Sequence, residues 1–306
     1  MAARMSLILV PIIVTIFAVV VIVGAVRRNR AIVFDADRYP GLVALRRSTV
    51  TARYVGLAAS VMVFVAVASL GQLGRGLFLA PAAAGAVLVL AVIIGQQLAY
   101  GGARKTGVAG VERRRVRDYL PRGLTVAVLL FLVILIASAA WTTSAASPDS
   151  LGLYRAFAVT GTETVLTKTG PEVVTVGSTR SPFPGAFYTS MLPIGLPIVL
   201  ALGVIGLWLT ARRPRNGADP QLVPADDALR RQTAEGIVAA VGLAVCVSLL
   251  GVALGAAGAV GGMAEHGVRY ILAAGALGLV ALGSLAVASW CAVLILVPGG
   301  GTVKPS

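Results

Sequence analysis

Charged residues, histidine and cysteine are all scarce in this 306-residue chain. Only 12% of the residues are charged, whereas 58% are hydrophobic. A soluble domain of this length needs a much larger charged surface, so an ordinary soluble fold is excluded. The single histidine, His266, argues against a histidine-based metal site. Cys246 and Cys291 both lie in apolar stretches, where inert buried thiols are favoured over a disulfide.

Signatures of enzymes and pumps are also missing. The sequence contains no phosphate-binding loop or nucleotide-binding motif, which argues against ATP hydrolysis by this chain. None of its basic or acidic residues falls deep inside an apolar run. Intramembrane ionisable groups mark proton relays and membrane-embedded catalysis, so their absence argues against both. We therefore expect no catalytic residue, no cofactor and no metal site, and an enzyme ranks below the other functional classes.

Long apolar runs, by contrast, are abundant. Lipid offers the backbone no hydrogen-bond partners, so a run that spans the bilayer, about 20 residues, is expected to be a helix. Seven such runs cover residues 5–26, 54–71, 77–98, 123–145, 190–211, 236–260 and 270–297. The sequence therefore predicts an all-α polytopic membrane protein with seven transmembrane helices. The first run is longer than the core of a signal peptide and is followed by Arg27 and Arg28, so we expect it to be retained as a helix.

The distribution of positive charge predicts the orientation in the membrane. Twenty of the 26 Lys and Arg residues lie in the loops and the tail that seven spans place on one side. By the positive-inside rule this side is cytoplasmic, which puts the N-terminus outside and the C-terminus in the cytoplasm. Arginine outnumbers lysine by 23 to 3, and alanine, valine and glycine dominate. This bias is typical of high-GC bacterial genomes, so we expect the bacterial cytoplasmic membrane.

One basic segment occurs twice, 184 positions apart and without a gap. Seven of fifteen aligned residues are identical, which favours an internal duplication. The repeated pairs are Asp35 and Asp219, Pro40 and Pro224, Ala44 and Ala228, Leu45 and Leu229, Arg46 and Arg230, Arg47 and Arg231, and Thr49 and Thr233. The duplication predicts two three-helix repeats joined by a linking helix, a 3+1+3 arrangement with both repeats in the same sense. The predicted regions are the first repeat at 1–98, a basic loop and linking helix at 99–145, an external loop at 146–189 and the second repeat at 190–306.

The external loop has its own predicted structure. Residues 164–167 and 173–176 are β-prone, and Lys168-Thr169-Gly170-Pro171 between them is typical of a turn. We therefore expect a small external β-hairpin.

This topology is similar to that of a known transporter family. Parallel repeats related by an axis along the membrane normal occur in some transporters. The 3+1+3 order with an external N-terminus resembles the SWEET sugar carriers. The resemblance is one of topology, since none of their motifs is present, and it implies no residue role or substrate. The chain as a whole also resembles uncharacterised multi-pass membrane proteins of high-GC Gram-positive (actinobacterial) type, which implies no activity.

The basic loops supply the candidate docking residues, which are Arg46, Arg47, Arg113, Arg114, Arg115, Arg230 and Arg231. They are interpreted either as topogenic charge against the anionic headgroups of the lipid bilayer or as a docking surface for a cytoplasmic or membrane protein partner. Nucleic acid is disfavoured as a partner, because basic loops are expected in any such protein. In the second copy Asp226 and Asp227 replace Leu42 and Val43, which favours a solvated helix start.

Two functional hypotheses remain. The first is a non-catalytic accessory or sensing component of the membrane that works with a partner protein. The repeated basic segments and the lack of ionisable groups deep in the spans motivate it. The alternative is a facilitative transporter of a neutral or amphipathic small solute, motivated by the parallel repeat. Hydroxyl groups such as those of Ser60, Thr142 and Ser284 would then line the path.

Overall fold

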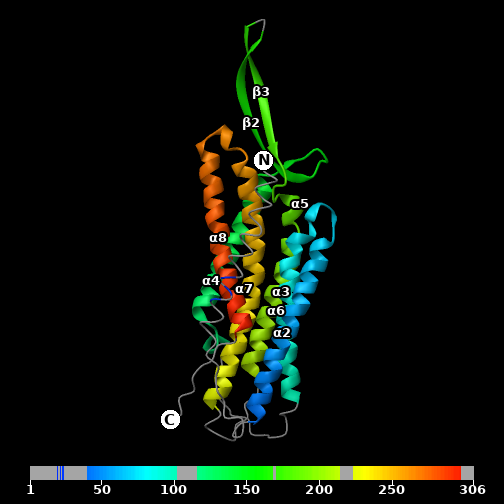
Figure 1. The fold of residues 1–306 in the computed structure, drawn as a ribbon, viewed down its shortest axis with the longest axis vertical. Helices are drawn as coiled ribbons and strands as arrows, with labels where there is room; N and C mark the ends of the chain where they lie inside the picture. Colours follow the sequence, from blue (N-terminus) through cyan, green and yellow to red (C-terminus); the bar gives the residue numbers. More distant parts are fainter. Residues whose placement is uncertain are drawn as a thin grey trace.

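The computed structural model describes residues 40–101, 116–167, 170–213 and 223–297, together with Val19, Val21 and Val23. Within these residues, six helices are long and apolar enough to cross a membrane. They are α2 (Pro40–Ser69), α3 (Gly76–Gly101), α4 (Arg122–Ser144), α6 (Leu192–Arg212), α7 (Val223–Gly261) and α8 (Val268–Leu296). The chain is therefore an all-helical, multi-pass membrane protein in its main body (Figure 1).

The remaining helical elements are short connections. They are η1 (Gln72–Gly74), η2 (Val116–Asp118), α5 (Ala186–Thr189) and η4 (Ala264–His266). Six of the seven predicted spans are thus found as helices. The predicted span at 5–26 lies outside the described residues, apart from the three valines, which are helical. The seven-span topology, its orientation and the duplication stay predictions.

Helix α7 forms the centre of the bundle. It packs against α3, α4, α6 and α8, and it contributes much of the largest hydrophobic core. A helix surrounded in this way is expected to be apolar on every side. Glycines let the neighbouring backbones approach closely. Gly242 of α7, for example, lies against Val128 of α4 and the thiol of Cys291 on α8.

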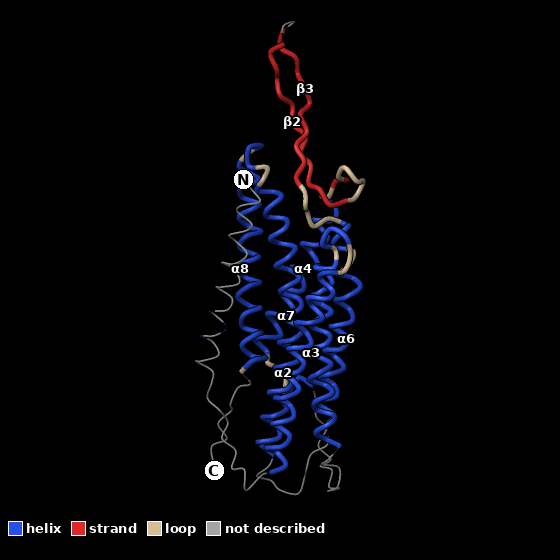
Figure 2. Tube along the Cα trace, turned by 45° about the vertical axis from the view of Figure 1, so that its right-hand side comes forward, coloured by secondary structure: helices blue, strands red, loops and turns tan. Residues whose placement is uncertain are grey.

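A long β-hairpin projects from one end of the bundle (Figure 2). Strands β2 (Tyr154–Thr167) and β3 (Gly170–Arg180) pair antiparallel, from Phe157 opposite Arg180 to Thr167 opposite Gly170. The short strand β1 (Ser147–Pro148) adds to β2, which gives the sheet order β1-β2-β3. The predicted hairpin is therefore confirmed, but it is longer than expected. The paired part of the hairpin extends for roughly 35 Å, at about 3.4 Å per residue.

Aromatic residues hold the hairpin on the helices. The ring of Phe183 lies 5.2 Å from that of Phe157 and 6.1 Å from that of Trp141 on α4. Tyr270, at the start of α8, meets Phe157 edge to face. Arg155 of β2 also pairs with Asp149, whose side chain is only 6% exposed. These contacts fix the hairpin base, so we refer to this end as the hairpin end.

Candidate functional site at the basic end

The opposite end of the bundle, termed the basic end, comprises η2, the first turns of α2 and α7, and the last turn of α6 (Figure 1). Its centre is a buried ion-pair cluster. The carboxylate of Asp226 accepts hydrogen bonds from Arg230, at 2.9 Å from Nε, and from Arg213. The Arg230 side chain is fully buried, and those of Arg213 and Asp226 are 4% and 12% exposed. The two guanidinium groups therefore depend on this carboxylate.

The local sequence explains this geometry. Asp226 and Arg230 are four residues apart on α7, a spacing that places them on one face of the helix. Asp226 also occupies the first turn of α7, where the helix dipole favours negative charge. Arg213 directly follows the last residue of α6, so the end of that helix brings its side chain to the cluster.

Arg230 also contacts the end of the neighbouring helix α6. Nη1 of Arg230 lies 3.4 Å from each of the carbonyl oxygens of Thr210 and Ala211. These carbonyls belong to the last turn of α6, where helices lack internal partners and carry partial negative charge. Arg230 thus caps the C-terminus of α6, and the carbonyls provide the second negative partner.

The network extends from α7 and α6 to α3 and α2. The side-chain amide of Gln96 on α3 donates to the hydroxyl of Thr210, at 3.1 Å. Arg53 of α2 is buried, and its Nη2 donates to the carbonyl oxygen of Gln232 at 2.6 Å. A Cβ on Gly236 would lie 2.9 Å from that Nη2, so the glycine makes the room that Arg53 occupies. Four helices are therefore joined by polar contacts at the basic end.

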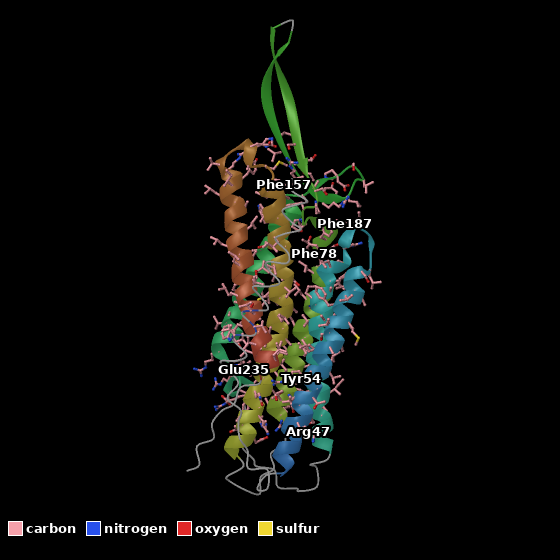
Figure 3. The ribbon with its side chains drawn as sticks, viewed as in Figure 1. Arg47, Tyr54, Phe78, Phe157, Phe187 and Glu235 are labelled. Atoms are coloured by element: carbon pink, nitrogen blue, oxygen red, sulfur yellow. The ribbon has the colours of Figure 1, made fainter. Side chains whose placement is uncertain are left out.

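Two tyrosines tie the adjoining elements to the cluster. The hydroxyl of Tyr54 donates to the carbonyl oxygen of Leu296, the last residue of α8, at 2.9 Å. The hydroxyl of Tyr119 lies 3.3 Å from the carboxylate of Asp227, and its ring lies beneath the Arg230 guanidinium. Figure 3 shows Tyr54 on α2, with Arg47 farther toward the end of the bundle.

The structure separates the predicted docking residues. Arg47 and Arg231 are exposed, as a docking surface requires. The prediction for Arg230 needs correction, because its side chain is fully buried and binds within the protein. Arg46 lies in α2, but its side chain is outside the described residues. Arg113, Arg114 and Arg115 are also outside them.

The prediction of a solvated start for the second-copy helix is also wrong. Asp226 is buried in the cluster, and Asp227 is half-buried against Tyr119. Sequence reasoning missed Arg53, Arg213 and Asp226 as members of one network. The four-residue spacing of Asp226 and Arg230 was the signal that could have predicted their pairing. The aligned segment lacks this signal, because it has Leu42 in place of the acid.

Exposed arginines surround the buried cluster. They are Arg47, Arg117, Arg122, Arg212 and Arg231. Arg212 stacks 4.2 Å above the ring of Trp208, an arrangement typical of side chains at a membrane interface. Arg117 makes a long contact, 3.9 Å, with exposed Asp118. The basic end thus combines a fixed interior with a positively charged surface.

Among the described residues, three serines of the spans bond to their own helices, whereas the hydroxyl of Ser248 on α7 is buried without a hydrogen-bond partner. Ser60 donates to the carbonyl of Gly56, Ser284 to that of Val280, and Ser289 to that of Leu285. Each of these bonds stays within its own helix. Cys246 and Cys291 are buried free thiols, in agreement with the prediction.

No metal-binding group of His, Cys, Asp or Glu occurs among residues 40–101, 116–167, 170–213 and 223–297. Comparison with protein-family models, curated proteins and solved structures gave no match.

Proposed function

We propose that this protein is a non-catalytic accessory or sensing component of the bacterial cytoplasmic membrane, which works with a partner protein at its basic end. One observation carries the proposal: an ion-pair cluster fixes the helix ends there, while further arginines remain on the surface. By the positive-inside rule, this end faces the cytoplasm.

The arrangement suits recognition of an acidic surface. Arg47 and Arg231 project from two helices that the buried network holds in place. A preorganised set of charges binds with a smaller entropic cost than a flexible one. Such a surface attracts acidic partners over a distance set by the ionic strength. We therefore expect a partner whose contact surface is acidic and whose binding weakens with salt.

Copurification from native membranes in a gentle detergent tests the proposal. The wild-type protein is expected to retain one partner in stoichiometric amount, identified by mass spectrometry. The double variant Arg47→Glu with Arg231→Glu is expected to lose it. Arg269→Glu is the matched control, because Arg269 is exposed at the hairpin end and its reversal should leave the partner bound.

Lipid binding alone predicts a different result. If the arginines contact only anionic headgroups, no stoichiometric partner copurifies, and this outcome would refute the accessory function. Reconstitution in neutral lipid separates the cases further, since binding to a protein partner persists there.

A facilitative transporter is the second candidate. The predicted parallel repeat favours it, whereas Ser60, Ser284 and Ser289 bond to their own helices and are a poor lining for a neutral polar solute. Uptake measured in liposomes with a panel of neutral and amphipathic solutes tests this candidate. Saturable uptake of any solute would promote it over the accessory function.

A further inference from the structure

We infer that a cavity between α2, α3 and α7 binds the hydrocarbon chain of a bilayer lipid. The cavity has a volume of about 320 Å³. Its lining consists of Leu57, Ser60, Val61, Phe64, Pro81, Ala84, Gly85, Leu88, Ala240, Leu243, Ala244 and Val247. This binding site goes beyond the proposed function, because it lies in the spans and does not involve the surface at the basic end.

The packing of α3 between its neighbours creates the cavity. On one side a Cβ at Gly56 of α2 would lie 2.4 Å from the Cβ of Ala91, so α2 and α3 are in close contact. On the other side a Cβ at Gly85 of α3 would lie 2.6 Å from the Cβ of Ala244 on α7. Helix α3 is therefore tightly packed against both α2 and α7, and the cavity lies where the three helices meet.

The polar network defines the end of the cavity nearest the basic end. Arg53 of α2 donates to the carbonyl oxygen of Gln232 on α7 and lies against Gly236. The lining residues begin one helical turn farther along each helix, at Leu57 on α2 and at Ala240 on α7. The Arg53 contact thus joins α2 to α7 beside the cavity.

The lining restricts the chemistry of the ligand. Ser60 is its only hydroxyl, and that hydroxyl donates to the carbonyl of Gly56 at 2.7 Å. A buried water needs two to four polar partners, which this lining does not supply. A charged or polar solute would lose its hydrogen bonds without replacement. The occupant that matches an uncharged, apolar lining is a hydrocarbon chain.

The position of the cavity identifies the source of that chain. Val61 lines the cavity and is 57% exposed, on a face of α2 that also exposes Met62 and Val65. Leu57 to Phe64 lie in the middle of the candidate span Arg47–Ser69, at the depth of acyl chains. Moving an acyl chain from the bilayer into the cavity gains no hydrophobic free energy, because both surroundings are apolar. Dispersion contacts with the lining therefore retain the chain, and we expect it to exchange with the bilayer.

Photolabelling in lipid vesicles tests the inference. The probe is a phospholipid with a photoactivatable diazirine near the end of one acyl chain, and the full-length protein is reconstituted with it. We expect labelling of Val61 and Leu243 to exceed labelling of Val133 on α4 and Leu282 on α8 severalfold. The latter two residues are at least as exposed as Val61, so exposure alone predicts no such excess.

Substitutions that change the cavity sharpen the test. Ala84→Phe fills the space, and labelling of Val61 is expected to fall to the level of Val133. Ala58→Phe is the matched control on the exposed face of α2, outside the lining, and is expected to leave labelling unchanged. Phe64→Ala enlarges the cavity and is expected to increase labelling, which keeps the inference testable if Ala84→Phe does not fold.

Several results would overturn the inference. Equal labelling of cavity and surface residues is one of them. Labelling of Val61 that changes in neither Ala84→Phe nor Phe64→Ala is another. A free fatty-acid probe that labels Val61 while the phospholipid does not would exclude the bilayer lipid as the source. A photoactivatable amino acid at position 61 that cross-links to a second copy of the chain would replace the lipid by a protein contact.

Discussion

Loss of the negative charge on Asp226 is expected to destabilise the protein strongly. Asp226→Asn keeps the size of the side chain but removes the charge that Arg213 and Arg230 share. Both guanidinium groups are almost completely buried, so water cannot compensate for the loss. Breaking a buried pair costs about 3–5 kcal/mol.

The carbonyl groups at the end of α6 determine where in that range the loss of stability is expected to lie. Thr210 and Ala211 still face Arg230 in the variant, so we expect the lower end, about 3 kcal/mol. This corresponds to a change of roughly 150-fold in the unfolding equilibrium. The free energy of unfolding can be measured in mixed micelles by titration with a denaturing detergent, followed by tryptophan fluorescence.

Glu265→Gln is the matched control for this experiment. Glu265 and Arg180 are both exposed and stand 3.5 Å apart, so their pair is worth less than about 1 kcal/mol. If the two variants lose similar amounts of stability, the buried cluster does not hold the basic end together. A triple variant with Asp226→Leu, Arg213→Met and Arg230→Met should recover most of the loss, because an apolar replacement leaves no buried charge.

Three further predictions concern other parts of the molecule. Gly236→Val should displace Arg53 from Gln232 and destabilise the protein by about 1–3 kcal/mol, measured in the same titration. Gly251→Ala is the control, because a Cβ at Gly251 meets no atom within 4 Å. Burial acts to raise the pKa of Asp149, but hydrogen bonds from the amides of Leu153 and Leu151 and from Arg155 outweigh it and lower the pKa below 3.8. The stability that Asp149 gives to the hairpin base is therefore complete above about pH 3.8 and is lost as the pH falls through the lowered pKa. The exchange protection of the Leu151 amide, relative to the unfolded chain at the same pH, should fall there, and Asp149→Asn should abolish that pH dependence. Cys246 and Cys291 should react with a maleimide only after unfolding, whereas an exposed Ser69→Cys thiol should react in the native protein. Rapid native labelling of the wild-type protein, whose two thiols are this buried pair, would count as contrary evidence.

Local composition predicted some elements closely and others poorly. Helix α4 spans Arg122–Ser144, against a prediction of 123–145, because its apolar run ends sharply at both sides. Helix α7 begins at Val223, well before the predicted span at 236. The prediction placed the helix where the sequence is apolar, so it excluded Arg230 and Arg231. In the structure, the pairing of Arg230 with Asp226 lets the helix continue into the basic end.

The hairpin shows the same limit for strands. The β-prone stretches at 164–167 and 173–176 located it, but β2 begins at Tyr154 and β3 ends at Arg180. The additional strand residues are set by cross-strand pairing and by the aromatic contacts of Phe157, not by their own propensity. Long-range contacts of this kind leave no periodic signal in the sequence.

The amino-acid sequence by itself determined that the chain crosses a membrane as helices, because apolar runs of this length admit no other backbone hydrogen bonding in lipid. It also located the basic segments. Only the tertiary structure decided what each arginine does. Arg230 and Arg231 are adjacent, yet one is fully buried and the other exposed, since a helix turns through about 100° per residue. The cavity, too, exists only where α2, α3 and α7 meet, and its lining residues are separated by up to 190 positions in the chain.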